Sequence, residues 1–246
     1  MTRRPEIADP VGYGGDRPVF ASYTRPSDLP DRMPIFPLQR AILLPRVAMP
    51  LNIFEPRYLE MIDAALSGSR LIGMVQPRRA VGDSEEVESP KDKAAELRII
   101  GCAGRLTSFS ETGDGRYLIT LTGVARFEVK EEIAGDMPYR RARVSYDRFL
   151  CDFQRGQGED DVDRVHLLKV LRAYLEANNL KADWQAINRS SNEFLVNTLS
   201  MISPYGPEEK QALLEAADLR TRAEVLVALA EIELAKRDDG TGSTMQ

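Results

Sequence analysis

The spacing of apolar residues changes near Cys151, and this change limits the possible folds most strongly. Before Cys151, short apolar runs are interrupted by Pro37, Pro45 and Pro50, as is typical of short, bent strands, because proline cannot donate a hydrogen bond to a neighbouring strand. After Cys151, apolar residues recur every three or four positions, which is the spacing of amphipathic helices. The sequence therefore predicts an α+β protein with strands first and helices second.

The first part also contains one predicted helix between its strands. Pro56 suits the first helical position and Gly68 supplies a stop, so we expect a helix between them. Leu71–Val75 is predicted to form a buried strand. Residues 141–149 are predicted to form another, with alternate residues on one face, namely Ala142, Val144 and Tyr146.

A hairpin is the clearest local prediction. Two β-rich runs lie between Arg98 and Val129, and residues 112–116 between them include two glycines and an aspartate that tolerate a turn. Gly123 interrupts the second run, which predicts a bend or bulge there. Together the strands are expected to form a small, partly closed β-barrel of about six strands.

The second part is predicted to form a small bundle of four helices. The first helix carries an apolar stripe that includes Val165, Leu168 and Leu171. Two further helices are expected to begin at capping boxes, Ser190 to Glu193 and Thr221 to Glu224, and another begins at Pro207.

The domain boundaries follow from these patterns. We predict a mobile arm over residues 1–32, a barrel subdomain over 33–150, a helical bundle over 151–237 and a disordered tail over 238–246. The alternative is that the arm docks on the folded body through its apolar residues Val19, Phe20 and Tyr23. A long polar loop is predicted from Pro77 to Glu96.

The overall charge argues against general binding to nucleic acid. A net charge of -5 and a pI near 5.2 leave few unpaired cations for a phosphate backbone. No apolar run of about 18 residues occurs, and the first residues lack the apolar segment of a secretory signal. We therefore expect a cytoplasmic protein that does not bind a membrane.

The residues available for chemistry favour a protein that is not an enzyme. His166 is the only histidine and lies on a predicted helix, where a solvated surface residue is the simpler interpretation. Cys102 lies on a predicted strand and is expected to be a small buried apolar residue, and two lone cysteines cannot form a zinc site. No phosphate-binding loop occurs in the sequence. We expect no cofactor and no metal.

Several separated motifs resemble the N-terminal substrate-binding domain of Lon proteases and occur in that family's order. The motifs are Ile35 to Leu38, Leu51 to Tyr58, Gly101 to Leu106, Asp114 to Tyr117, Gly123 to Phe127 and Pro207 to Glu215. The resemblance covers roughly residues 33–236. It implies a PUA-like β-barrel followed by an α-helical bundle, and the binding of unfolded or tagged polypeptides.

The resemblance does not extend to proteolysis. The ATPase and protease domains of full Lon proteases have no counterpart in this sequence, so we expect a stand-alone, non-catalytic member of bacterial type. Its role would be that of an adaptor or modulator of an ATP-dependent protease. The oligomeric state and the natural client stay open.

The binding surface is predicted at the seam between the barrel and the bundle. Four aromatic residues are proposed to line it, with two arginines on the long loop as its rim: Phe109, Phe149, Phe153 and Tyr205, then Arg78 and Arg79. For each aromatic residue, a place in the core is the alternative. Glu55-Pro56-Arg57-Tyr58 is interpreted as structural, because Glu55 favours a helix N-terminus and Tyr58 can pack inward.

Two other functions stay open from the sequence. A PUA-like module associated with RNA or nucleotides would need a continuous basic face made of Arg78, Arg79, Arg140, Arg141 and Arg143. A scaffold that associates with itself would use the last helix, through Leu226, Leu229 and Ile232.

Overall fold

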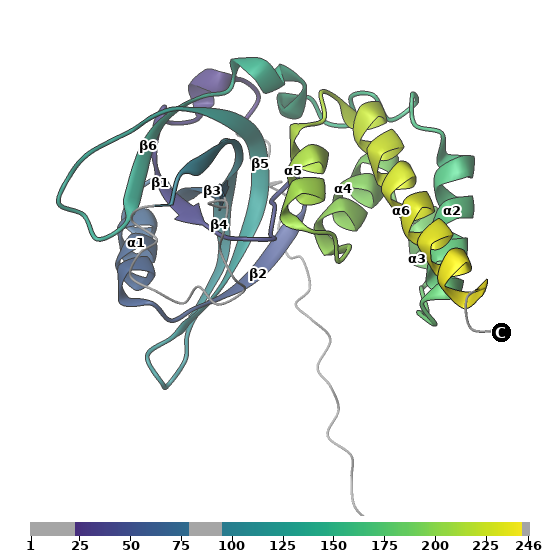
Figure 1. Cartoon of the computed structure of the whole chain (residues 1–246). Coiled ribbons are helices and arrows are strands. Elements are labelled where there is room, and N and C mark those ends of the chain that lie inside the picture. Colours follow the sequence, from purple (N-terminus) through teal and green to yellow (C-terminus); the bar gives the residue numbers. More distant parts are fainter. Residues whose placement is uncertain (1–22, 79–94, 243–246) are drawn as a thin grey trace, which may run out of the picture.

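The computed structural model describes residues 23–78 and 95–242 (Figure 1). Its strands form one six-stranded mixed sheet in the order β2-β5-β4-β3-β1-β6. The strands are β1 (Arg32–Pro37), β2 (Ala48–Ile53), β3 (Leu71–Pro77), β4 (Leu97–Glu111), β5 (Tyr117–Glu132) and β6 (Arg140–Ser145). The fold is α+β, as predicted.

The sheet curls because β5 has two different partners along its length. Its first half pairs with β2, from Tyr117 to Thr122, and its second half pairs with β6, where Val129 lies opposite Val144. β6 also pairs with β1, and β1 and β3 form the parallel pair in the sheet. Among the described residues, β2 pairs with β5 alone and remains an open edge. The predicted partly closed barrel is therefore found as a curled six-stranded sheet, in which β5 pairs with β6 and β2 leaves one edge open.

The predicted hairpin and bulge are both confirmed. β4 and β5 form the hairpin, and their pairing passes from Ala103 opposite Ala125 to Gly104 opposite Gly123, which leaves Val124 as an extra residue on β5. The chain approaches closely here, because a Cβ atom on Gly123 would lie 2.0 Å from the carbonyl oxygen of Leu44. Glycine therefore permits both the bend and this contact.

The strand predicted for residues 141–149 is shorter in the structure. β6 ends at Ser145, and the 3-10 helix η3 (Asp147–Phe153) follows. The reason is local, because the backbone of Tyr146 turns to φ -102 and ψ -1, which is not extended. Burial of Ala142, Val144 and Tyr146 confirms that they share the inner face.

Two short helices lie within the strand-rich half of the chain. The 3-10 helix η1 (Pro26–Asp28) precedes β1, and α1 (Pro56–Leu66) follows β2 with the bounds that Pro56 and Gly68 predicted. Five helices lie after η3: α2 (Arg164–Ala177), α3 (Trp184–Arg189), α4 (Asn192–Ile202), α5 (Pro207–Glu215) and α6 (Leu219–Gly242). Figure 1 shows these helices beside the sheet, with α5 nearest to β5 and α2 on the side away from the sheet.

The helical half differs from its prediction in three details. The helix α3 was missed, although Asp183 caps it by accepting hydrogen bonds from two backbone N–H groups. The caps of α4 and α6 are Ser191 and Asp218, which differ from the predicted Ser190 and Thr221. The last helix continues to Gly242 and so passes the predicted start of the tail at residue 238.

The apolar stripe of α2 is also displaced from the predicted one. Leu167, Val170 and Leu171 are buried, whereas Val165 is 82% exposed. The face of α2 that meets α6 decides which residues are buried, and the spacing alone fits several rotations of the helix.

Two apolar clusters form the core. The smaller cluster lies in the curled part of the sheet and includes Met33, Ile35, Phe127 and Val144. The larger cluster runs from α1 across the sheet to the last helices, and it joins residues as distant as Tyr58 and Leu226. Because this cluster crosses the predicted boundary at residue 150, the two halves share one packed core.

The body begins before Arg32. Leu29 is buried, and the Tyr23 hydroxyl accepts a hydrogen bond from Arg105 at 2.6 Å. The docking alternative for the arm is therefore correct at Tyr23, while Val19 and Phe20 lie outside the described residues. Within the described ranges, none of the helices is both long enough and apolar enough to cross a bilayer.

Candidate functional site

The four aromatic residues predicted at the seam lie in separate environments. Phe149 is fully buried, with the Arg126 guanidinium 4.1 Å from its ring centroid. Phe153 packs edge-on against Tyr146, with centroids 6.1 Å apart. Phe109 lies towards the tip of the β4–β5 hairpin, where it packs against Tyr117. The structure therefore does not gather these three rings on one exposed surface.

Tyr205 and the two loop arginines are also separate. Tyr205 lies between α4 and α5 and packs against the larger apolar cluster. Arg78 is exposed and forms an ion pair with Glu96 at 2.8 Å. Arg79 and the loop residues 79–94 lie outside the described residues. Of the four predicted aromatic residues, Phe149 is therefore fully buried, Phe153 and Tyr205 are partly buried against the apolar clusters, and Phe109 is exposed.

The predicted basic face is largely neutralised by acidic partners. Arg140 pairs with Glu132, with Nε 2.8 Å from Oε2, and Arg143 pairs with Glu131 at 2.7 Å. Arg141 has no ion pair with any residue that the structure describes. Paired arginines are poor contacts for a phosphate backbone, so this arrangement argues against the RNA-binding alternative.

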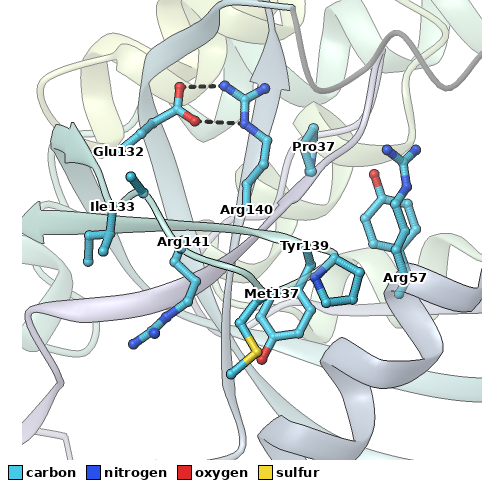
Figure 2. Close-up of a pocket in the computed structure, with 12 residues that line it drawn as sticks. Pro37, Arg57, Glu132, Ile133, Met137, Tyr139, Arg140 and Arg141 are labelled. Atoms are coloured by element: carbon cyan, nitrogen blue, oxygen red, sulfur yellow. Dashed lines mark hydrogen bonds and ion pairs between the residues drawn. The ribbon is translucent and has the colours of Figure 1, made fainter.

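A pocket of about 190 Å³ brings together two motifs that are distant in sequence (Figure 2). One wall comes from the end of β1 and the start of α1, and the other comes from the loop between β5 and β6. The lining residues are Pro37, Arg57, Tyr58, Glu132 to Gly135 and Met137 to Arg141. This pocket is the candidate functional site.

The α1 wall is rigid because its tyrosine is anchored in the core. Tyr58 is buried and packs edge-on against Phe36, with ring centroids 4.6 Å apart. The Arg57 guanidinium lies 4.6 Å from the Tyr58 ring centroid and forms an ion pair with Glu55 at 2.7 Å. The motif therefore has the structural role predicted for Glu55 and Tyr58, and it also places Arg57 at the pocket.

The opposite wall combines an ion pair with apolar side chains. Figure 2 shows Glu132 and Arg140 paired at one end of the pocket, away from Arg57. Arg140 also donates to the carbonyl oxygen of Ala95 at 2.7 Å. Tyr139 is buried, whereas Met137 is 48% exposed. An exposed methionine beside fixed arginines suits a flexible peptide better than a chemical reaction.

The structure places the possible catalytic residues apart from this pocket. His166 lies on α2 with Nε2 3.3 Å from Oε1 of Glu231, and both side chains are about half exposed. Cys102 is fully buried, as predicted, and burial raises the pKa of its thiol well above the usual value. Among residues 23–78 and 95–242, no three potential metal ligands are grouped.

Sequence reasoning identified both walls of the pocket without joining them. The Glu55 to Tyr58 motif and the Arg140–Arg141 pair were each considered, but about eighty residues separate them in the chain. Pairing of β6 with both β1 and β5 brings the two segments together. This long-range pairing has no local signal in the sequence.

The family model for the substrate-binding domain of ATP-dependent protease La (LON) matches residues 32–231. The chain belongs to this family. Members with similar sequences include Lon protease 2 of Myxococcus xanthus, which is 29% identical over 205 residues, or 82% of this chain and 24% of that protein. Lon protease 2 of Sorangium cellulosum is 33% identical over 125 residues, or 50% of this chain and 15% of that protein. The chain thus spans about a quarter or less of these relatives.

Solved structures of the family share the fold. A Lon N-terminal domain protein from Xanthomonas campestris superposes with a TM-score of 0.56 at 20% identity, over 80% of this chain and 97% of that one. The N-terminal domain of the Mycobacterium avium complex Lon protease gives a TM-score of 0.58 at 18% identity, over 81% and 98%. The matches to family members thus cover the substrate-binding domain and do not include an ATPase or protease domain.

Proposed function

We propose that this protein recognises polypeptide segments, without catalysing a reaction, and acts as an adaptor or modulator of an ATP-dependent protease of the Lon type. Membership of a family defined by substrate binding supports this function. A PUA-like character of the curled sheet and a cytoplasmic location belong to the same proposal. Unfolded or tagged polypeptides are the expected ligands.

The observation that carries the proposal is the combination of side chains in the pocket beside α1. Apolar groups of Pro37, Ile133 and Met137 lie beside the cations of Arg57 and Arg141. An extended polypeptide exposes apolar side chains and backbone carbonyl oxygens, so one surface that offers apolar contacts beside arginine donors can bind many sequences.

Fluorescence anisotropy with a labelled unfolded polypeptide tests this proposal. Replacing Met137 with Asp puts a charge on the apolar rim and is expected to weaken binding about tenfold, because contact with a bound apolar side chain is lost. Met137 is exposed, so the variant should fold. Val165→Asp is the matched control, since Val165 is more exposed still and lies on α2, outside the pocket.

Each outcome of this experiment tests a different part of the proposal. Equal binding by the wild type and Met137→Asp would exclude this pocket as the contact. Failure of the wild type to bind any polypeptide would refute recognition itself. Saturable binding of labelled RNA alone, run in parallel at physiological salt, would favour the RNA-binding alternative.

A further inference from the structure

A second pocket, of about 390 Å³, lies where the curled sheet meets the helices. Its lining comes from the segment between β1 and β2, from β5, η3, the segment before α2, α4, and from the segment before α6 and its start. Four arginines line it: Arg46, Arg126, Arg220 and Arg222. The charge partners of these arginines decide what the pocket can bind.

Three of the arginines have carboxylate partners within the protein. Arg126 is 1% exposed, and its Nε and Nη2 donate to the two oxygens of Asp152 at 2.9 and 2.8 Å. The Nε of Arg46 donates to Glu193 at 2.8 Å, and Arg220 pairs with Glu224 at 2.8 Å. These three cations are therefore already neutralised.

Arg222 is different, because it is 3% exposed and forms no ion pair with any described residue. Its Nε donates to the carbonyl oxygen of Leu213 at 2.9 Å and its Nη1 to Oδ1 of Asn197 at 2.8 Å. Its Nη2 is buried and has no hydrogen-bond partner. A buried donor without a partner is costly, and more so when it carries charge.

The surroundings of Arg222 also lower the pKa of its guanidinium group. Burial, together with the neighbouring Arg126 cation, lowers the pKa of Arg222 to about 9. The two other acids that line the pocket, Asp161 and Asp218, are exposed to water. Asp218 also accepts a hydrogen bond from the Thr221 backbone at 2.7 Å, as the cap of α6. Water screens both carboxylates, so they compensate the buried cation only weakly. The buried Asp152 carboxylate also attracts Arg222, but it is already bonded to Arg126 and offsets the charge of Arg222 only in part.

We propose that this pocket binds one carboxylate group of a polypeptide, either the C-terminal carboxylate or an Asp or Glu side chain, and that Arg222 is the residue that receives it. The guanidinium would turn slightly toward the pocket so that Nη2 donates to a ligand oxygen. A charge-assisted hydrogen bond then fills the missing contact of a buried cation. The inference rests on the proposed polypeptide recognition and adds a chemical preference to it.

The test compares three labelled peptides that share one neutral sequence. One ends in a free carboxylate, one ends in an amide, and one ends in an amide and carries a single internal Glu. A hydrogen bond to a buried charge corresponds to roughly a tenfold to hundredfold change in affinity, so one carboxylate peptide should bind the full chain that much more tightly than the neutral amide. The better of the two identifies the source of the carboxylate.

Variants link this preference to Arg222. Arg222→Met is expected to remove the preference, while the matched control Arg220→Met, which changes an exposed and already paired arginine of the same pocket, should keep it. Should Arg222→Met fail to fold, the wild-type comparison of carboxylate and amide peptides still decides. Arg222→Lys provides a second, charge-retaining variant that should keep part of the preference.

A measurement of the melting temperature separates failure of this inference from failure of the proposed function. Acetate, in excess over chloride at equal ionic strength, should raise the melting temperature of the wild type and not that of Arg222→Met. Equal binding of all three peptides would overturn the carboxylate site while leaving polypeptide recognition intact. No peptide binding with clear stabilisation by acetate would overturn polypeptide recognition and keep the site, and absence of both would overturn both.

Discussion

The curled sheet and the helical half are stabilised by different kinds of contact. In the smaller core cluster of the sheet, apolar side chains such as Met33, Ile35, Phe127 and Val144 pack together on strands joined by backbone ladders. Where the helices meet the sheet, buried polar and charged side chains add to the contacts of the larger apolar cluster, among them Gln76, Arg126, Asp152, Gln211 and Arg222. Apolar packing is non-directional, whereas these polar contacts have specific geometry.

A few bonds show how this geometry positions α5 on the sheet. The Nε2 of Gln76 donates to Oε1 of Gln211 and to the carbonyl oxygen of Pro207, each at 3.0 Å. Gln211 in turn donates to the Ile100 carbonyl oxygen on β4 at 3.2 Å. The comparison teaches that the smaller core of the sheet is stabilised mainly by buried apolar area, while the position of the helices on the sheet also depends on directional hydrogen bonds between buried polar groups.

The largest effect is expected from breaking the ion pair at the seam. Arg126→Met leaves the Asp152 carboxylate buried without its cation, which should lower the free energy of unfolding by about 3–5 kcal/mol. Urea denaturation measures the change. The double variant Arg126→Met with Asp152→Leu is the control and should recover much of the loss, and a double variant as unstable as the single one would contradict this account.

A smaller effect is expected from the bulge of the sheet. In Gly123→Ala the new Cβ meets the Leu44 carbonyl oxygen, so the backbone must shift at a cost of about 1–3 kcal/mol. Gly113→Ala is the matched control, because no atom lies within 4 Å of its Cβ position. Thermal unfolding of both variants measures the difference. Equal stability of the two would show that the bulge tolerates a side chain.

The last effect concerns the buried lysine of the helical half and depends on pH, so that only part of it appears at any one pH. The Nζ of Lys210 donates to the carbonyl oxygens of Ser200 and Met201 at 2.9 and 2.6 Å, and burial lowers its pKa from 10.5 to about 8. Between these two values the unfolded chain binds more protons than the folded protein, so stability should rise as pH increases from about 8 toward 10.5.

Comparison with Lys210→Met isolates this contribution. The wild type should gain stability relative to the variant as pH rises through this window, and the difference should be constant below it. Denaturation at several pH values measures both proteins under the same conditions. A difference that stays constant across the window would show that the two carbonyl oxygens offset the burial of the ammonium group.

Local features were predicted well because they depend on neighbouring residues. The β4–β5 hairpin, the bulge at Gly123 and the bounds of α1 all follow from turn, proline and glycine positions. The partners of long strands did not follow in the same way, since β5 changes from β2 to β6 along its length. The displaced stripe of α2 has the same origin, because its neighbour α6 selects the buried face.

In the candidate sites, too, single motifs could be predicted from the sequence, whereas their meeting in space could not. Arg57, Tyr58 and Arg140 drew attention as sequence motifs, yet their meeting at one pocket depends on β6 lying beside β1. Arg222 lies beside a residue that had been read as a helix cap, and no sequence pattern marks it as buried. An arginine is usually exposed, so its burial follows from the packing of α6 on α4 and α5.

The sequence by itself determined the family, the α+β class, the order of strands before helices and the local turns, because proline, glycine and apolar spacing act over a few residues. Only the tertiary structure decided the open-edged curl of the sheet, the shared core across residue 150 and the unpaired charge of Arg222. The physical reason is that burial and pairing between distant segments depend on the whole packed chain, where each contact competes with water and with other partners.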